Sequence, residues 1–332
     1  MTDTFKALWV EETTDNKYLH SIKQRQLSDL PDNEVLIEVQ YSSLNYKDAL
    51  SAFGNKGVTK DYPHTPGIDA AGVVLSDTTG QFNQGDKVLV FGYDLGMNTP
   101  GGLAQRISVP ANWIVPCPSS LTLKDAMIYG TGGLTAAMCI DKLILMGAKP
   151  NDGAVAVTGA SGGVGSMTIA ILHKLGFEII AYTGKSDDAY LRQLGASEVL
   201  HRDQINEIGS KPMGRGLWAH AIDTLGGDYL ANIVKQLKPG GGVSACGLAA
   251  GVNFQLNVFP FITRGVSLLG VDSVNIPLQQ KRYFWQKVSD EYYLDNLASF
   301  SHCISLEEVL AILPKFLDGT VQGRYVVDLN KS

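Results

Sequence analysis

A glycine-rich segment at residues 159–165 has the composition of a phosphate-binding turn. It follows the apolar run Val155–Thr158, which has the pattern of a buried strand, and it precedes a helix-like stretch. Where a strand leads through a glycine turn into a helix, unpaired N–H groups and the positive end of the helix can bind a pyrophosphate. Ala160 stands where the strict G-x-G-x-x-G pattern has its first glycine, but Gly162 and Gly165 keep its spacing. A tight turn that serves packing alone is the alternative.

The end of the following predicted strand indicates which dinucleotide would bind. NAD is usually held by an acidic residue about 20 residues beyond the turn, and residues 180–185 contain none. Thr183, Gly184 and Lys185 offer a hydroxyl, an open backbone and a cation, which suit a 2′-phosphate. Arg202 is a second cation, for the phosphate or the adenine face, although solvated surface positions would also explain both charges. The sequence favours NADPH, with these candidate contacts: Ser161, Gly162, Gly163, Val164, Thr183, Gly184, Lys185 and Arg202.

Two patterns of secondary structure surround these residues. Residues 5–115 contain short β-like runs broken by turn residues, which predicts a mostly antiparallel barrel-like or sandwich-like domain. Helical spacing follows at residues 124–128 and 133–146. From residue 154 short apolar runs alternate with helical stretches, which favours a parallel sheet wrapped by helices. The expected strands of that sheet are residues 154–158, 179–182, 199–200, 220–223, 242–246 and 266–271, and a helix at 306–317 and a strand at 324–329 close the chain.

Composition narrows the class of protein. The 332 residues are 45% hydrophobic and 18% charged, which suggests about two domains and argues against disorder. With 27 Lys and Arg against 33 Asp and Glu, the net charge is −6, so nucleic acid is not expected as a partner. We find no signal-peptide pattern and no run of about 18 apolar residues, and so expect a cytoplasmic protein with no membrane partner. Four scattered cysteines without a C-x-x-C pair argue against disulfides and structural zinc.

Five segments resemble the medium-chain dehydrogenase/reductase superfamily and, within it, the YhdH/YhfP quinone oxidoreductase group. They are residues 42–50 (SSLNYKDAL), 66–72 (PGIDAAG), 158–165 (TGASGGVG), 221–224 (AIDT) and 264–274 (RGVSLLGVDSV). The resemblance covers essentially the whole chain and implies an α/β fold. A GroES-like, β-rich catalytic domain would comprise residues 1–124 and 276–332, and a Rossmann doubly wound parallel sheet would occupy residues 125–275 and bind NADP. The group includes NADPH-dependent acryloyl-CoA reductases.

The resemblance also predicts a reductase without zinc. Zinc members of the superfamily carry a cysteine in the segment matching residues 45–48, and a Gly-His-Glu where this chain has Gly67, Ile68 and Asp69. His64 and one aspartate are too few for the usual three protein ligands of catalytic zinc. Without a Lewis acid, substrates that are already polarised, such as activated alkenes and quinones, are the more plausible ones.

Reduction of an enoyl thioester needs a hydrogen-bond donor for the carbonyl oxygen and a proton for the α-carbon. The resemblance places the cleft at residues 45–48. Tyr46 is our leading catalytic candidate and could also contact the nicotinamide, with packing as the alternative, and Asn45 could fix the carboxamide or the substrate oxygen. Asp48 is expected to cap a turn or a helix. Lys56 could meet a CoA phosphate or only water.

On the nucleotide-binding side, Leu248, Ile262 and Ser273 match positions that line the nicotinamide pocket in the resembling group. Asp223 could face a ligand or cap the next helix. Residues 266–271 match the strand that pairs across a two-fold axis in many members, which predicts a homodimer. The leading hypothesis is NADPH-dependent reduction of an activated C=C bond, with an enoyl-CoA, above all acryloyl-CoA, as the small-molecule substrate. Quinone reduction is the alternative in the same class, and a non-catalytic NADPH-binding sensor or structural protein is the alternative in another.

Overall fold

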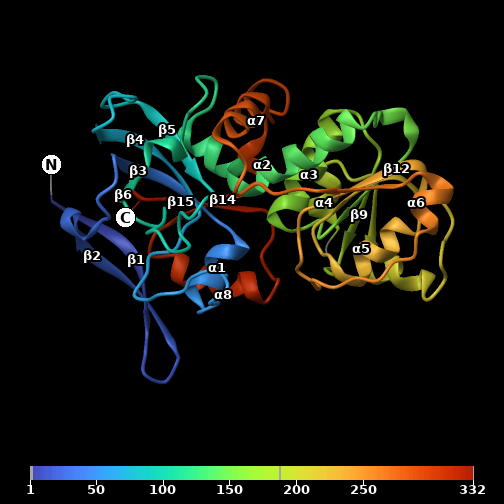
Figure 1. Ribbon diagram of the computed structural model, residues 1–332, viewed down its shortest axis with the longest axis horizontal. Helices are drawn as coiled ribbons and strands as arrows, with labels where there is room; N and C mark the ends of the chain where they lie inside the picture. Colours follow the sequence, from blue (N-terminus) through green and yellow to red (C-terminus); the bar gives the residue numbers. More distant parts are fainter. Residues whose placement is uncertain (1–2, 187, 332) are drawn as a thin grey trace. The chain divides into compact units, whose positions relative to one another are not determined.

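The computed structural model describes residues 3–186 and 188–331, which form two compact units (Figure 1). The first unit comprises Met1–Thr131, Val274–Glu291 and Asp295–Ser332, and the second comprises Gly132–Ser273 and Tyr292–Leu294. The domain assignment at 124/125 and 275/276 stays a prediction.

The first unit is built on a mostly antiparallel sheet, as the turn-rich pattern predicts. Its seven strands lie in the order β14 (Ser301–Ser305), β15 (Arg324–Asp328), β3 (Val35–Leu44), β4 (Asp69–Asp77), β5 (Lys87–Phe91) and β7 (Ile114–Pro116), with β6 (Arg106–Val109) also paired to β3. Only β14 and β15 run parallel. The alternation of Val35, Ile37 and Val39 places all three in the core, because successive side chains of a strand point to opposite faces.

Strand β1 (Thr4–Glu12) lies at the start of the β-like region expected at residues 5–115, whereas its partner β2 (Tyr18–Gln26) was not singled out in the sequence. The two strands form a separate antiparallel pair. Helices α1 (Tyr46–Ala52) and α7 (Leu278–Asp290) were also not expected, whereas α8 (Val309–Leu317) falls within the predicted helix. Helix α1 begins at Tyr46, so it positions the leading catalytic candidate.

The second unit contains the parallel sheet predicted from the alternating pattern (Figure 1). Its six strands lie in the order β10 (Glu198–His201), β9 (Ile179–Thr183), β8 (Val155–Thr158), β11 (Trp218–Asp223), β12 (Leu237–Ala245) and β13 (Ser267–Gly270), and all pairs are parallel. Four shorter helices belong to this unit: α3 (Gly163–Lys174), α4 (Ala189–Gln193), α5 (Gly227–Val234) and α6 (Phe259–Arg264). The chain passes from β8 to β9 on one side and then to β11 on the other. Ligands of open α/β sheets bind at the carboxyl end of such a switch point.

Helix α2 (Leu123–Leu145) joins the two predicted helical stretches into one element with a break at Gly130, where φ is 48° and ψ is −159°. An added Cβ at Gly130 would lie 2.5 Å from Ser43 Oγ, so glycine is required for space as well as for its backbone angles. By length and composition α2 could cross a membrane, which corrects our expectation that no stretch is long enough; 78% of its apolar window is buried, as in the core helix of a soluble protein. Gly130 and the glycines after it interrupt the helical pattern, so the sequence predicted two shorter helical stretches in place of one long helix.

Candidate functional site

The turn after β8 leads directly into α3, which begins at Gly163. The left-handed backbone falls on Gly159, with φ of 57°, and not on the position of Ala160. An added Cβ at Gly165 would lie 2.4 Å from the carbonyl oxygen of Gly159, so only glycine lets the helix pack this closely against the turn. The first N–H groups of α3 therefore face the carboxyl end of the sheet, where an anion can bind them.

Two hydroxyl groups meet beside this turn. The side-chain oxygens of Ser161 and Thr183 lie 3.3 Å apart, and both residues are buried. The backbone N–H of Lys185 donates to Thr183 Oγ1 at 3.2 Å. Burial lowers the pKa of the Lys185 ammonium, and a bound phosphate would oppose that effect because a nearby negative charge favours the protonated form. The structure thus brings together three of the residues that the sequence singled out.

Arg202 lies against Gly184, although the two residues are on different strand ends. An added Cβ at Gly184 would lie 3.1 Å from Arg202 Nε, so the absent side chain leaves room for the guanidinium. The guanidinium carbon lies 5.8 Å from the centroid of the Tyr229 ring. Gly184 and Arg202 therefore form one surface with the Ser161–Thr183–Lys185 group, which fits a phosphorylated ribose and is consistent with the missing acid at the end of β9.

Asp223 holds the ends of the two central strands together. Its carboxylate accepts from Thr158 Oγ1 at 2.7 Å and from the backbone N–H of Gly226 at 2.8 Å, just before α5. Burial raises the pKa of this carboxyl group. Gly247 closes the same edge, since an added Cβ there would lie 2.0 Å from the carbonyl oxygen of Thr224. These contacts support the capping role for Asp223.

The three residues expected at the nicotinamide are placed differently from one another. Leu248 is 60% exposed and Ile262, in α6, is 72% exposed. Ser273 is buried, and its hydroxyl accepts from Thr135 Oγ1 at 2.8 Å. The role of these three residues at the nicotinamide stays a prediction.

In the first unit, both ends of the Asn45 amide are engaged. Its Nδ2 donates to Asp69 Oδ2 at 2.8 Å, and its Oδ1 accepts from Arg324 at 3.3 Å. Its backbone N–H donates to Asp48 Oδ2 at 2.7 Å. Asn45 therefore fixes the start of α1, whose first residue is Tyr46, and Tyr46 is 44% exposed. Both ends of the Asn45 amide are thus bonded within the protein, and its expected contact with the carboxamide or the substrate oxygen stays a prediction.

Asp69 lies at the centre of a buried polar cluster that we did not anticipate. Besides Asn45, it accepts from Ser43 Oγ at 2.5 Å and from the backbone N–H of Thr131 at 2.9 Å. The buried Arg324 donates to Ser43 Oγ at 3.0 Å and to the carbonyl oxygen of Ile128 at 2.9 Å. One signal was available, because Arg324 is followed in its strand by Tyr325, Val326 and Val327, and a charge buried in such a strand needs partners.

Asp48 is fully buried and completes the cluster. Its Oδ1 accepts from the backbone N–H of Ile68 at 2.8 Å and its Oδ2 from that of Asn45, which confirms the expected helix cap. Burial, and after it the negative charge of Asp69, raise the pKa of Asp48 to about 7. At neutral pH the group is therefore divided between the neutral and ionised forms.

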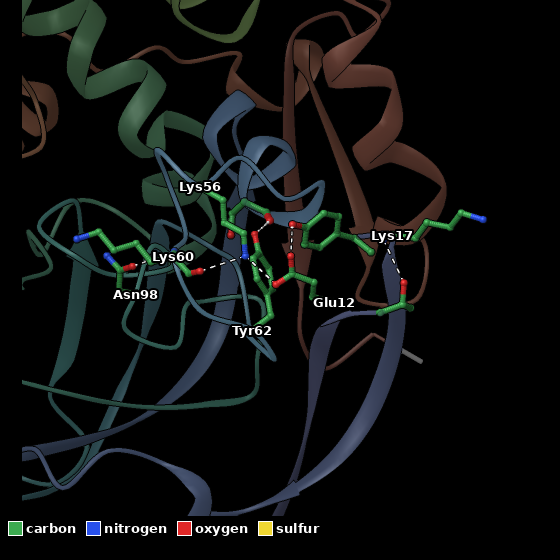
Figure 2. Close-up of polar contacts among 9 residues, drawn as sticks. Glu12, Lys17, Lys56, Lys60, Tyr62 and Asn98 are labelled. Atoms are coloured by element: carbon green, nitrogen blue, oxygen red, sulfur yellow. Dashed lines mark hydrogen bonds and ion pairs between the residues drawn. The ribbon is translucent and has the colours of Figure 1, made fainter. Parts of the chain in front are cut away.

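Lys56 is half exposed but is paired with an acidic side chain. Its ammonium donates to Glu12 Oε2 at 2.7 Å and to the carbonyl oxygen of Lys60 at 3.2 Å, and it lies 4.7 Å from the centroid of the Tyr62 ring (Figure 2). The Tyr18 hydroxyl donates to the other carboxylate oxygen of Glu12 at 2.8 Å. The charge of Lys56 is already paired, so this structure offers no particular support for a contact with a CoA phosphate.

The residues around Asp69 do not fit a zinc ion. Residues 45–48 contain no cysteine and Ile68 replaces the histidine of the zinc members, while the carboxylate oxygens of Asp69 accept hydrogen bonds from Ser43, Asn45 and Thr131. Across residues 3–186 and 188–331, no three His, Cys, Asp or Glu side chains are placed to hold a metal ion.

Comparisons with known proteins agree with this fold. The family described as "Zinc-binding dehydrogenase" matches residues 163–290, and "Alcohol dehydrogenase GroES-like domain" matches residues 31–119. Acrylyl-CoA reductase AcuI of Ruegeria pomeroyi is 40% identical over 328 residues, which are 98% of this chain and 99% of that protein. These matches confirm the predicted combination of a GroES-like part and a Rossmann-type parallel sheet.

Two solved structures are similar over nearly the full length. Escherichia coli K-12 YhdH with bound NADPH is 41% identical, with a TM-score of 0.93, and the match covers 98% of this chain and 100% of that one. Bacillus subtilis yhfP with NAD bound is 40% identical, with a TM-score of 0.95, and the match covers 98% and 99%.

Proposed function

We propose that this chain, which belongs to the medium-chain dehydrogenase/reductase superfamily and there to the YhdH/YhfP/AcuI group, is an oxidoreductase that uses NADPH to reduce an activated C=C bond. The preferred substrate is acryloyl-CoA, which becomes propanoyl-CoA. One observation carries the proposal: the chain is 40% identical to an acrylyl-CoA reductase over nearly the whole length of both proteins. Quinone reduction is the second candidate, because the resemblance of residues 42–50 and 264–274 extends to quinone oxidoreductases.

The second unit would hold NADPH, which supplies a hydride when bound. Ser161, Gly162, Gly163 and Val164 would bind the pyrophosphate at the start of α3. Thr183, Gly184, Lys185 and Arg202 would bind the 2′-phosphate, and the contact of Arg202 with Gly184 supports this assignment. Leu248, Ile262 and Ser273 would contact the nicotinamide end. In one related structure NADPH is bound and in another NAD, so the preference for NADPH rests on these four 2′-phosphate residues.

Tyr46 would hydrogen-bond the substrate carbonyl, on which negative charge develops, and deliver a proton to the α-carbon. Its exposure at the first position of α1 supports this role, and no described residue hydrogen-bonds to its hydroxyl. Asn45 would act through Tyr46, because Asp69 and Arg324 hold both ends of its amide.

The assembly and location are part of the proposal. We infer a cytoplasmic homodimer with a catalytic domain of residues 1–124 and 276–332 and an NADP-binding domain of residues 125–275. Strand β13 is at the edge of its sheet, and the segment before it exposes large apolar side chains, among them Val252, Val258 and Phe259. Such a patch next to an open strand edge supports pairing with a second copy.

The test is to follow the oxidation of NADPH by the purified protein with acryloyl-CoA, crotonoyl-CoA and 1,4-benzoquinone in one buffer. We expect the highest kcat/KM with acryloyl-CoA, and a large loss of kcat in Tyr46→Phe with NADPH binding retained. Turnover of benzoquinone alone would favour the quinone reductase. Tight NADPH binding without turnover of any of the three would indicate a sensor or structural protein.

A further inference from the structure

Two cysteines that are distant in the sequence meet inside the second unit. Cys139 is in α2 and is completely buried, and Cys246 directly follows β12 and is partly exposed. The Ser244 hydroxyl, two residues before Cys246, donates to the carbonyl oxygen of Cys139, which places the two cysteines next to each other. The neighbouring Cys246 thiol and burial raise the pKa of the Cys139 thiol well above its usual value. The proposed reaction uses neither thiol.

Packing of α2 against β12 explains why these thiols meet. Gly242, Ser244 and Cys246 alternate along the strand direction and so share one face. An added Cβ at Gly242 would lie 3.3 Å from Leu143, and Ser244 Oγ donates to the carbonyl oxygen of Cys139 at 2.9 Å. Cys139 lies one helical turn before Leu143 in α2. Moving along the strand from Gly242 toward Cys246 therefore follows the helix from Leu143 toward Cys139, which brings Cys246 to Cys139. Two well-packed elements thus hold the pair in place.

We propose that Cys139 and Cys246 form a reversible intramolecular disulfide when the protein meets a peroxide. The sulfur of Cys246 attacks one peroxide oxygen, the O–O bond breaks, and water leaves, so that sulfur is oxidised to a sulfenic acid and peroxide is reduced. The sulfur of Cys139 then attacks that of Cys246, the S–S bond forms, and the S–O bond breaks as a second water leaves with the thiol proton. In total, two thiols and one hydrogen peroxide yield one disulfide and two waters.

The order of the two steps follows from exposure. Cys246 is the accessible thiol, and its sulfur donates to the carbonyl oxygen of Asp223 at 3.5 Å. Cys139 has no exposed surface and a raised pKa, so it can react only with a group delivered to it inside the protein. Cys246 therefore reacts with peroxide first and Cys139 resolves the product.

The disulfide would move the end of β12, at the sheet edge that carries the proposed NADPH-binding residues. This consequence rests on the proposed function. The backbone N–H of Cys246 donates to the carbonyl oxygen of Asp223 at 3.0 Å, and the next residue, Gly247, has no space to move toward Thr224. A covalent S–S bond is shorter than a thiol contact, so it draws Cys246 toward α2 and away from Asp223. We expect the oxidised protein to bind NADPH several-fold more weakly than the reduced protein.

The experiment uses the full chain carrying Cys117→Ser and Cys303→Ser, which leaves only the two thiols of interest. Hydrogen peroxide should consume both thiols of the folded protein, intact mass should fall by the two thiol hydrogens, and peptide mapping should identify a Cys139–Cys246 cross-link that dithiothreitol reverses. Adding Cys139→Ser should leave a sulfenic acid at Cys246 that dimedone captures. The circular dichroism spectrum of each variant establishes that it is folded.

Oxidation of Cys246 without any cross-linked peptide, or a cross-link between two copies of the chain, would overturn the disulfide. NADPH affinity of the reduced and oxidised forms is measured separately. A cross-link with unchanged affinity would remove the effect on cofactor binding, whereas a reduced protein that fails to bind NADPH at all would count against the proposed function and not against the disulfide.

Discussion

The backbone N–H of Thr131 donates to the carboxylate of Asp69 at 2.9 Å, a contact made where α2 breaks at Gly130. The Thr131 hydroxyl donates to the other oxygen of the same carboxylate at 2.5 Å. A continuous helix would direct the Thr131 N–H along its own axis, because helical N–H groups bond to carbonyl oxygens four residues back. The break in α2 therefore satisfies a buried charge on β4, and through Asp69 it holds Asn45 and the start of α1.

The break makes Gly130 sensitive to substitution. Gly130→Ala introduces a Cβ within 2.7 Å of Asp69 Oδ2, at a backbone φ of 48°. Backbone strain and overpacking each cost about 1–3 kcal/mol. We expect the unfolding free energy, measured by urea denaturation, to fall by the sum of these two costs. Gly80→Ala is the matched control, because Gly80 has a φ of 72° but nothing within 4 Å. Equal losses in the two variants would contradict a role for the crowded site.

Arg324 is expected to be essential for the buried cluster. Arg324→Met removes the donors to Ser43, Asn45 and Ile128 and takes a buried positive charge out of the polar cluster around Asp69. Removing one partner from a buried charged group costs about 3–5 kcal/mol, measured as the change in unfolding free energy. Arg192→Met breaks an exposed pair with Asp188 and should cost less than about 1 kcal/mol. A similar small loss for both arginines would show that the cluster contributes little.

Stability should depend on pH through Asp48. Its folded pKa, about 7, is above the unfolded value of 3.8, so the folded state binds the proton more tightly. The contribution of the Asp48 proton to the unfolding free energy is fully present below the unfolded pKa. It is lost as pH rises through the folded pKa, and the loss is at most about 4 kcal/mol. The fall in unfolding free energy between about pH 5 and pH 8 should be smaller in Asp48→Asn than in the natural chain.

The comparison with Asp48→Asn is needed because other groups titrate in the same range. Burial lowers the pKa values of His64 and His220, so both histidines favour folding as pH rises and oppose the effect of Asp48. They are present in both proteins, and the difference between the two pH profiles isolates Asp48. Parallel profiles would mean that Asp48 is ionised throughout.

Lys185 should determine the choice of cofactor. A charge-assisted bond to the 2′-phosphate is worth about 1.5–3 kcal/mol, so Lys185→Ala should raise the KM for NADPH by about tenfold or more while the KM for NADH stays the same. Arg202→Ala should act in the same direction. Lys211→Ala, at an exposed lysine of the same unit, is the control. An unchanged ratio of the two KM values in Lys185→Ala would reject the role.

Activity should not require zinc. Protein purified without added metal should contain far less than one zinc per chain by elemental analysis, and prolonged treatment with EDTA should leave kcat unchanged. The reason is the available side chains, since residues 45–48 lack the cysteine of the zinc members and Ile68 replaces their histidine. Stoichiometric zinc that is lost together with activity would overturn this prediction.

The sequence by itself determined the parallel sheet and the glycine turn, and it predicted which residues would bind a 2′-phosphate. Their signals are local: a strand of four or five apolar residues, a glycine turn and a missing acid all lie within about 30 consecutive residues, the size of one βαβ unit. The elements β8, α3 and β9 accordingly appear where the pattern predicts them. The roles of Tyr46 and of the nicotinamide residues came from resemblance alone and stay predictions.

Only the tertiary structure decided which polar groups are buried together. Ser43, Asp69, Thr131 and Arg324 come from three strands and a broken helix that are separated by long stretches of chain. Nothing in the sequence around Asp69 specifies Arg324 as its neighbour, and nothing around Cys139 specifies Cys246. Desolvation and hydrogen bonding act between groups that are close in space, so the raised pKa of Asp48, the orientation of Asn45 and the thiol pair exist only once the sheets and helices have packed.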